Sequence, residues 1–179
     1  GVEQVVGDLE GGPDIAPEQV IAGFARRFRV AIACRDRSGR PVVWHHFANR
    51  GGAGAHAGGD GWSNLGVVQS PGSTPSPSVE RTEAVFPLHV ESYCLRPGSG
   101  GQGRFRGGAG ATYAFRYVGT EPGRLTPTGD GVVVPPPGLA GGLPGEPNAV
   151  RIERQGRLAD LEALSGTVPI LPGDLIVHD

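Results

Sequence analysis

Four polar side chains between residues 45 and 60 could bind a metal ion or transfer a proton: His45, His46, His56 and Asp60. On a β-strand the neighbours His45 and His46 point to opposite faces, so they cannot both bind one ion without distortion. His56 lies in a Gly-Ala-His-Ala-Gly stretch that offers no second ligand at a familiar spacing. A surface or packed histidine pair is therefore favoured, and no metal ligand is assigned. His45, His46 and Asp60 are retained as the catalytic candidates, because they flank the glycine-rich stretch 51–61.

Several other chemistries are excluded by the residue types present. All 16 basic residues are Arg, so the chain lacks the lysine of a phosphate-binding P-loop and the amine of a Schiff-base enzyme. Gly98–Gly103 matches the G-x-G-x-x-G pattern, but Arg104–Val118 after it is predicted as strand instead of helix. A glycine turn or a close backbone approach is favoured there, and no cofactor-binding residue is assigned. No G-x-S-x-G sequence occurs, so covalent catalysis has no support.

The remaining charged residues have simpler explanations than catalysis. Glu80, Glu83 and Glu91 could supply acid–base function, but a solvated strand face is the favoured interpretation. Arg104 and Arg106 are structural or interface candidates, and Arg106 is expected to pair with a carboxylate of this chain or of a partner. The net charge of −2 and the lack of a second basic run argue against nucleic acid as a partner.

Cys34 and Cys94 fit neither a metal-binding spacing nor a disulfide framework. Two buried free thiols in a reducing compartment are expected, with a single bridge left open. No apolar run approaches the length of a membrane span, and residues 1–10 lack the features of a secretory signal. A cytoplasmic protein with no membrane contact is therefore predicted.

The composition predicts a single turn-rich, mainly β domain with one short N-terminal helix. The 179 residues include 32 Gly and 17 Pro, but the hydrophobic fraction of 37% and the charged fraction of 19% are not those of a disordered chain. The glycines gather at 51–61, 98–110 and 138–145, with runs of Val, Ile, Phe and Tyr between them. Glycine and proline in these positions punctuate strands and break helices.

The elements that must position the candidate residues follow from local patterns. The helix is expected from Asp14 to Phe28, with Pro17 in its first turn and apolar residues at helical spacing. Pro87 predicts an edge strand or a bulge. Strands are expected at 28–34, 41–47, 83–95, 111–118, 129–137, 149–155 and 168–177, with a hairpin turn at 36–39, a long loop at 49–78 and a tight turn at 172–174.

Residues 76–110, SPSVERTEAVFPLHVESYCLRPGSGGQGRFRGGAG, resemble the signature of the hydantoinase B/oxoprolinase family. That signature reads approximately N-T-P-x-E-x-x-E-x-x-Y-P-L-x-V-E-x-Y-x-L-R-x-x-S-G-G-x-G-x-x-R-G-G-x-G. Residues 51–61, 136–145 and 171–174 are similar to further segments of the family. The resemblance covers about residues 41–179, with the helix and first strand in 1–40. It implies that the whole chain is one domain, the C-terminal portion of a B-type subunit.

The resemblance implies a subunit or fragment of an ATP-dependent amidohydrolase that acts on cyclic amides such as hydantoin, 5-oxoproline or a lactam. In this family an A-type partner binds ATP and phosphorylates the substrate, and the B-type subunit carries out hydrolysis, often with a divalent metal. The expected partners are that A-type subunit and the N-terminal B-type portion, in a hetero-oligomer. ATP with Mg and the divalent metal are expected in those partners, and no cofactor in this chain.

The family's metal-binding residues lie in the N-terminal part of B-type subunits, which the resemblance does not reach. No catalytic residue is therefore carried over, and the chain alone is expected to be inactive. Two alternatives remain open: a subunit of an ATP-dependent ketone carboxylase, and a non-catalytic assembly module that retains only the interface. A free-standing ligand-binding β module is a further alternative that the long glycine-rich loops permit.

Overall fold

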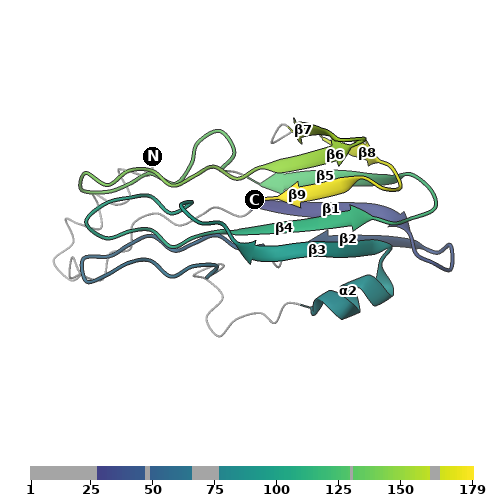
Figure 1. Cartoon of the computed structure of the whole chain (residues 1–179), viewed down its shortest axis with the longest axis horizontal. Helices are drawn as coiled ribbons and strands as arrows, with labels where there is room; N and C mark the ends of the chain where they lie inside the picture. The colour runs from purple at the N-terminus through teal and green to yellow at the C-terminus, as the bar shows by residue number, and fades with distance from the viewer. Residues whose placement is uncertain (1–27, 47–48, 66–76, 130, 162–165) are drawn as a thin grey trace.

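The computed structural model describes residues 28–46, 49–65, 77–129, 131–161 and 166–179, which form a β sandwich (Figure 1). The mainly β fold class is confirmed. The helix expected from Asp14 onward lies outside the described residues. In the described ranges, no helix has both the length and the hydropathy needed to cross a bilayer.

Within the described residues the strands form two antiparallel sheets. The smaller sheet has the order β2-β1-β5-β8, and the larger sheet has the order β3-β4-β9-β6-β7. The smaller sheet consists of β1 (Phe28–Arg35), β2 (Pro41–His46), β5 (Gly123–Gly129) and β8 (Val168–Ile170). The larger sheet consists of β3 (Leu88–Leu95), β4 (Ala111–Tyr117), β6 (Val150–Arg154), β7 (Arg157–Leu161) and β9 (Leu175–His178).

The core lies between the two sheets, where alternate residues of each strand meet. On β4, Tyr113, Phe115 and Tyr117 are 3%, 0% and 1% exposed, which confirms that these aromatic residues share one buried face. They face Ile32 of β1 and Trp44 of β2, and the rings of Trp44 and Phe115 meet edge to face at 5.1 Å between centroids. The inner faces of both sheets are therefore apolar and aromatic.

The predicted strand 83–95 is wrong at residues 83–85, which belong to the helix α2 (Val79–Val85). Ser78 caps this helix, because its Oγ accepts a hydrogen bond of 3.3 Å from the backbone N–H of Arg81. After Pro87 the chain enters β3, which pairs with β4 and carries a register shift between Val90 and Ser92. Within the described strands β3 lies at the border of its sheet, so both features that Pro87 predicted are present.

The C-terminal half departs from prediction in three places. Residues 131–137 form loop, while β5 lies earlier, at Gly123–Gly129. Pro127 is tolerated within β5 because it lies beyond the register paired with β8, which ends at Leu125. Strand β7 was not predicted, and 168–177 is interrupted at 171–174 by the tight turn that leads into β9.

Candidate functional site

Glycine-rich loops meet at one end of the sandwich (Figure 1). They line a pocket of about 120 Å³. The first loop follows β2, the second connects β3 to β4, and the third connects β5 to β6. The residues that line the pocket lie within 49–55, 96–111 and 136–148. His178 and Asp179, at the end of β9, also line the pocket. The glycine clusters seen in the sequence thus lie together in space.

Glycine is required in these loops because their backbones lie in direct contact. A Cβ atom on Gly52 would lie 1.8 Å from the carbonyl oxygen of Gly108, and one on Gly108 would lie 2.1 Å from that of Trp62. Short hydrogen bonds hold the same segments, from Ala53 N–H to the Trp62 carbonyl (2.8 Å) and from Gly108 N–H to the Ala53 carbonyl (2.9 Å). The predicted close backbone approaches are confirmed. They replace side-chain packing with backbone-to-backbone contact.

The third loop is joined to the second in the same way. A Cβ atom on Gly101 would lie 2.1 Å from the Leu143 carbonyl oxygen. Leu143 N–H donates to the Gln102 carbonyl at 2.7 Å, and Glu146 N–H donates to the Ser99 carbonyl at 2.9 Å. The G-x-G-x-x-G stretch is therefore a backbone contact surface, which agrees with the close backbone approach predicted there.

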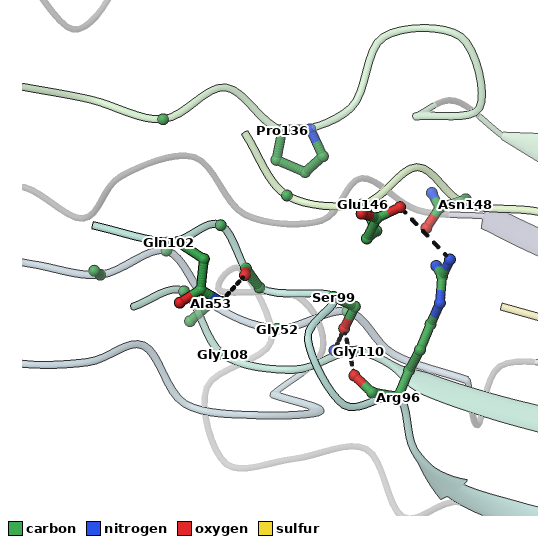
Figure 2. Close-up of a pocket in the computed structure, with 18 of the residues that line it drawn as sticks. Gly52, Ala53, Arg96, Ser99, Gln102, Gly108, Gly110, Pro136, Glu146 and Asn148 are labelled. Atoms are coloured by element: carbon green, nitrogen blue, oxygen red, sulfur yellow. Dashed lines mark hydrogen bonds and ion pairs between the residues drawn. The ribbon is translucent and has the colours of Figure 1, made fainter. Parts of the chain in front are cut away.

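Arg96 is the basic side chain labelled at the pocket in Figure 2, where it reaches from the second loop toward the third. Its Nη1 donates to the Pro147 carbonyl at 2.9 Å, and its Nη2 lies 4.0 Å from Glu146 Oε2. Ser99 Oγ donates to the Arg96 carbonyl at 2.8 Å and accepts from Gly110 N–H at 2.9 Å. The hydroxyl is thus engaged with backbone, so these groups suit positioning and binding more than bond cleavage.

The two histidines lie on opposite faces of β2, as the sequence predicted. His45 is exposed, while His46 is 2% exposed and lies with its ring centroid 4.2 Å from that of Tyr113. Burial, with a smaller contribution from His178, lowers the pKa of His46 to about 3, so its imidazole is neutral. Neither His45 nor His46 is among the described residues that line the pocket. Their catalytic role stays a prediction.

Asp60 joins the first loop to the second. Its Oδ1 accepts a hydrogen bond of 2.8 Å from Arg106 N–H, and its Oδ2 lies 3.7 Å from Arg106 Nη2. The expectation that Arg106 pairs with a carboxylate is therefore confirmed, within this chain. His56 stabilises its own turn, because its Nδ1 accepts from Gly58 N–H at 3.1 Å. Arg104 lies over the ring of Phe105, 5.4 Å from its centroid.

The three glutamates lie on two kinds of element. Glu80 and Glu83 belong to α2, so assigning them to a strand face was wrong for these two. Glu83 Oε1 accepts from Val90 N–H at 2.7 Å and lies 3.0 Å from His89 Nδ1. Glu91, on β3, is exposed and pairs with Arg116 at 2.6 Å, which agrees with the predicted strand face.

Both cysteines are free, as expected, but they are not both buried. Cys34 is half-buried on β1, and burial together with Asp36 raises the pKa of its thiol. Cys94 is exposed on β3. Among the same described residues, no three His, Cys, Asp or Glu side chains lie close enough to hold a metal ion.

Sequence reasoning missed the contribution of Glu146, Asn148, His178 and Asp179 to the pocket. The Asp179 carboxylate is held by Thr112 Oγ1 and by Arg151, and its side chain is 6% exposed. These partners lie between 28 and 67 residues away along the chain. No local spacing signals such contacts, so only the sheet topology reveals them.

These observations define a two-sheet antiparallel sandwich with a glycine-built loop end. Residues 4–179 match the model of the family described as Hydantoinase B/oxoprolinase, and the chain belongs to this family. The match includes residues 4–40, so it is longer than the resemblance recognised from motifs.

The chain is also similar to curated and solved relatives. It is 32% identical over 123 residues to caprolactamase subunit beta of Pseudomonas jessenii. The aligned region covers 63% of this chain and 21% of that subunit. The crystal structure of ATP-dependent caprolactamase from Pseudomonas jessenii matches 91% of this chain and 29% of its own, with a TM-score of 0.74 and 25% identity. A nucleotide-free acetone carboxylase structure matches 90% of this chain and 26% of its own, with a TM-score of 0.78. Its identity of 19% establishes the shared fold alone.

Proposed function

We propose that this chain supplies the C-terminal β region of a B-type subunit in an ATP-dependent amidohydrolase that acts on cyclic amides. The similarity to caprolactamase carries this proposal, because it holds in sequence at 32% identity and in structure at a TM-score of 0.74. A lactam is a cyclic amide, and hydantoin and 5-oxoproline share its ring amide bond. The proposed substrate class is therefore a cyclic amide such as a lactam, hydantoin or 5-oxoproline.

In this proposal the chain provides scaffold and interface to an active site that other chains complete. The chain spans 21% of the curated caprolactamase subunit and less than a third of either solved relative. The missing parts are an A-type ATP-binding subunit and the N-terminal B-type portion, which bring ATP with Mg and a divalent metal. Such an ATP-consuming hetero-oligomer works in the cytoplasm.

The loop end is the part of this chain that suits contact with a substrate-bearing surface. Its walls are glycine backbones, which let another molecule approach the peptide groups closely. Arg96 is held at the pocket by the Pro147 carbonyl (2.9 Å) and by a longer pair with Glu146 (4.0 Å), so its guanidinium is fixed in position, and an anionic group would compete with Glu146 for it. An unstrained amide is a poor electrophile until its carbonyl oxygen is phosphorylated by ATP. The phosphate attached in this way is negatively charged, and it is the anionic group that would approach Arg96.

Reconstitution tests the proposal. The chain, the A-type subunit and the N-terminal B-type portion are combined, and hydrolysis of caprolactam, hydantoin and 5-oxoproline is followed with and without ATP. Hydrolysis of at least one substrate should require all three polypeptides and ATP. Turnover by this chain alone, or turnover that persists when the chain is left out, would contradict the proposal. Formation of a carboxylated ketone from acetone and bicarbonate would move the assembly to the carboxylases.

A further inference from the structure

Arg96 is a largely buried cation that makes few hydrogen bonds. Its side chain is 24% exposed, and its guanidinium makes one hydrogen bond to a described residue, from Nη1 to the Pro147 carbonyl (2.9 Å). Arg154 has a more exposed side chain (40%), yet its guanidinium makes three, two to Asp174 and one to the Pro169 carbonyl. A guanidinium has five N–H donors, and buried donors are normally satisfied. Arg96 therefore has donors for an acceptor that the described part of the chain does not provide.

The pocket around Arg96 has room for a small anion. Its volume is about 120 Å³. A cavity of about 150 Å³ can hold a benzene ring, so an ion as small as phosphate fits here. The charged residues that line the described pocket are Arg50, Arg96, Glu146 and Asp179. The Asp179 carboxylate is already paired with Arg151, so Glu146 is the carboxylate that can interact with Arg96.

Glu146 is placed to compete for Arg96 without satisfying it. Figure 2 shows its side chain across from the guanidinium, with 4.0 Å between Glu146 Oε2 and Arg96 Nη2, which is beyond hydrogen-bond distance. The Glu146 backbone is fixed, because its N–H donates to the Ser99 carbonyl at 2.9 Å, whereas its side chain is 58% exposed. The carboxylate can therefore rotate into solvent without moving the loop. A long, exposed pair of this kind contributes little, so an acceptor with better geometry can replace it.

We propose that the pocket binds a small oxyanion through Arg96 and that Glu146 is an internal competitor, which the oxyanion displaces. Pro147 holds Nη1, so Nε and Nη2 can donate in parallel to two oxygens of one phosphate or carboxylate, as those of Arg154 do to Asp174. The inference rests on the proposed function for the source of the oxyanion. There, the phosphate on the activated amide and the carboxylate that ring opening creates both have this chemistry.

Titration of the nitrogen-15-labelled chain tests the site by NMR at pH 7 and constant ionic strength. Inorganic phosphate is the probe for the activated substrate, and 6-aminohexanoate, the ring-opened form of caprolactam, is the probe for the product. Signals of the Arg96 side chain and of the loop glycines report binding. Glu146→Gln removes the competitor. Glu121→Gln is its matched control, because Glu121 is similarly exposed (66%) and also lies near an arginine, Arg35 (3.5 Å).

At least one probe should bind the wild-type chain. Glu146→Gln should tighten this binding at least threefold, because no carboxylate then competes for the guanidinium, and Glu121→Gln should change it less than 1.5-fold. Arg96→Gln should abolish binding in a chain that circular dichroism shows to be folded; if this variant unfolds, the two glutamate variants decide. Tighter binding of phosphate assigns the site to the activated substrate, and tighter binding of 6-aminohexanoate assigns it to the product.

Three results would overturn the inference: no binding of either probe to the wild-type chain or to Glu146→Gln, equal effects of the two glutamate variants, or unchanged binding by folded Arg96→Gln. The inference and the proposed function can fail separately. Oxyanion binding at Arg96 without ATP-dependent hydrolysis by the reconstituted assembly would refute the proposed function and leave this inference standing. Hydrolysis by the assembly without oxyanion binding by this chain would do the reverse.

Discussion

His46 and His178 form a buried imidazole pair that must stay neutral in the folded protein. Their ring centroids are 5.4 Å apart, and they are 2% and 1% exposed. Burial lowers the pKa of His178 to about 4, although the neighbouring Asp179 opposes the shift, and the pKa of His46 is lowered to about 3. In the unfolded chain both histidines titrate near pH 6.5. The unfolded state therefore binds protons between pH 6.5 and 4 that the folded state does not.

The first prediction follows from this excess of bound protons in the unfolded state. The free energy of unfolding should be highest above about pH 6.5 and should fall with decreasing pH, by up to about 1.4 kcal/mol per pH unit for each histidine. His46→Leu should flatten the slope, whereas His45→Gln, on the exposed face of the same strand, should retain it. Urea unfolding at pH 7.5, 6 and 5 measures the slope. An unchanged slope in His46→Leu would show that His46 does not cause it.

Asp174 is a second buried charge, but it is paired. Burial raises the pKa of its carboxyl, and hydrogen bonds from Arg154 and from Leu171 N–H lower it by more, so the group stays ionised. Arg154 Nη2 and Nε lie 2.7 and 2.9 Å from the two carboxylate oxygens, and Asp174 is 2% exposed. Removal of the guanidinium would leave this charge without its partner.

The second prediction compares this pair with an exposed one. Arg154→Leu should lower the free energy of unfolding by about 3 kcal/mol, because a buried carboxylate loses its charged donor. Arg116→Leu, which removes the more exposed pair with Glu91, should cost about 1 kcal/mol or less. Urea unfolding at pH 7 gives both values. Equal losses in the free energy of unfolding for the two variants would mean that the burial of Asp174 does not determine the cost of removing its partner.

The third prediction concerns the glycine-rich loops as elements. A Cβ atom on Gly108 would lie 2.1 Å from a backbone oxygen, whereas one on Gly110 would meet nothing closer than 3.7 Å. Gly108→Ala should therefore separate the first and second loops and destabilise the protein by about 2 kcal/mol or more, while Gly110→Ala is tolerated. Thermal unfolding compares the two. Similar midpoints for both variants would refute the backbone-contact account of these loops.

Strands with alternating apolar residues were predictable from sequence, and those without them were not. β1, β2 and β4 carry regular Val, Ile, Trp, Tyr and Phe patterns, and the structure has them within one or two residues of prediction. In β5 the alternation of apolar residues is broken by Pro127, and β7 has no buried face. Neither strand was therefore predicted at its observed position. At 79–85 the cap formed by Ser78 and the i to i−4 backbone bonds override the β tendency of the neighbouring segment.

The candidate site was predictable in its glycines and not in its polar groups. Clustered glycines indicated close backbone approaches, because a residue without a side chain lets another backbone come into direct contact with its own. The pairing of Arg96 with Pro147 and Glu146 depends on two loops meeting after about 50 residues of intervening chain. Short-range patterns hold no information on such a contact. His46 shows the converse, because a polar residue in a strand became part of an aromatic core.

At the scale of the whole molecule, stability should follow strand position. β4 and β9 lie inside the larger sheet and bear Phe115 and Ile176, both 0% exposed, whereas β3 and β7 border it among the described strands. The fourth prediction is that backbone amides of β4 and β9 exchange hydrogen at least 100-fold more slowly than those of 92–95 and of β7. Hydrogen exchange with peptide-level mass spectrometry measures this. Uniform protection across the larger sheet would contradict it.

The position of β9 between β4 and β6 has a consequence for biosynthesis. β3–β4 and β6–β7 are each neighbours along the chain, and both pairs leave the ribosome before the strand that joins them. Until β9 emerges, the inner edges of β4 and β6 have no common partner, so the backbone N–H and C=O groups of both edges are unpaired. The nascent protein is thus most vulnerable to proteases and most visible to chaperones at the residues that are best protected afterwards.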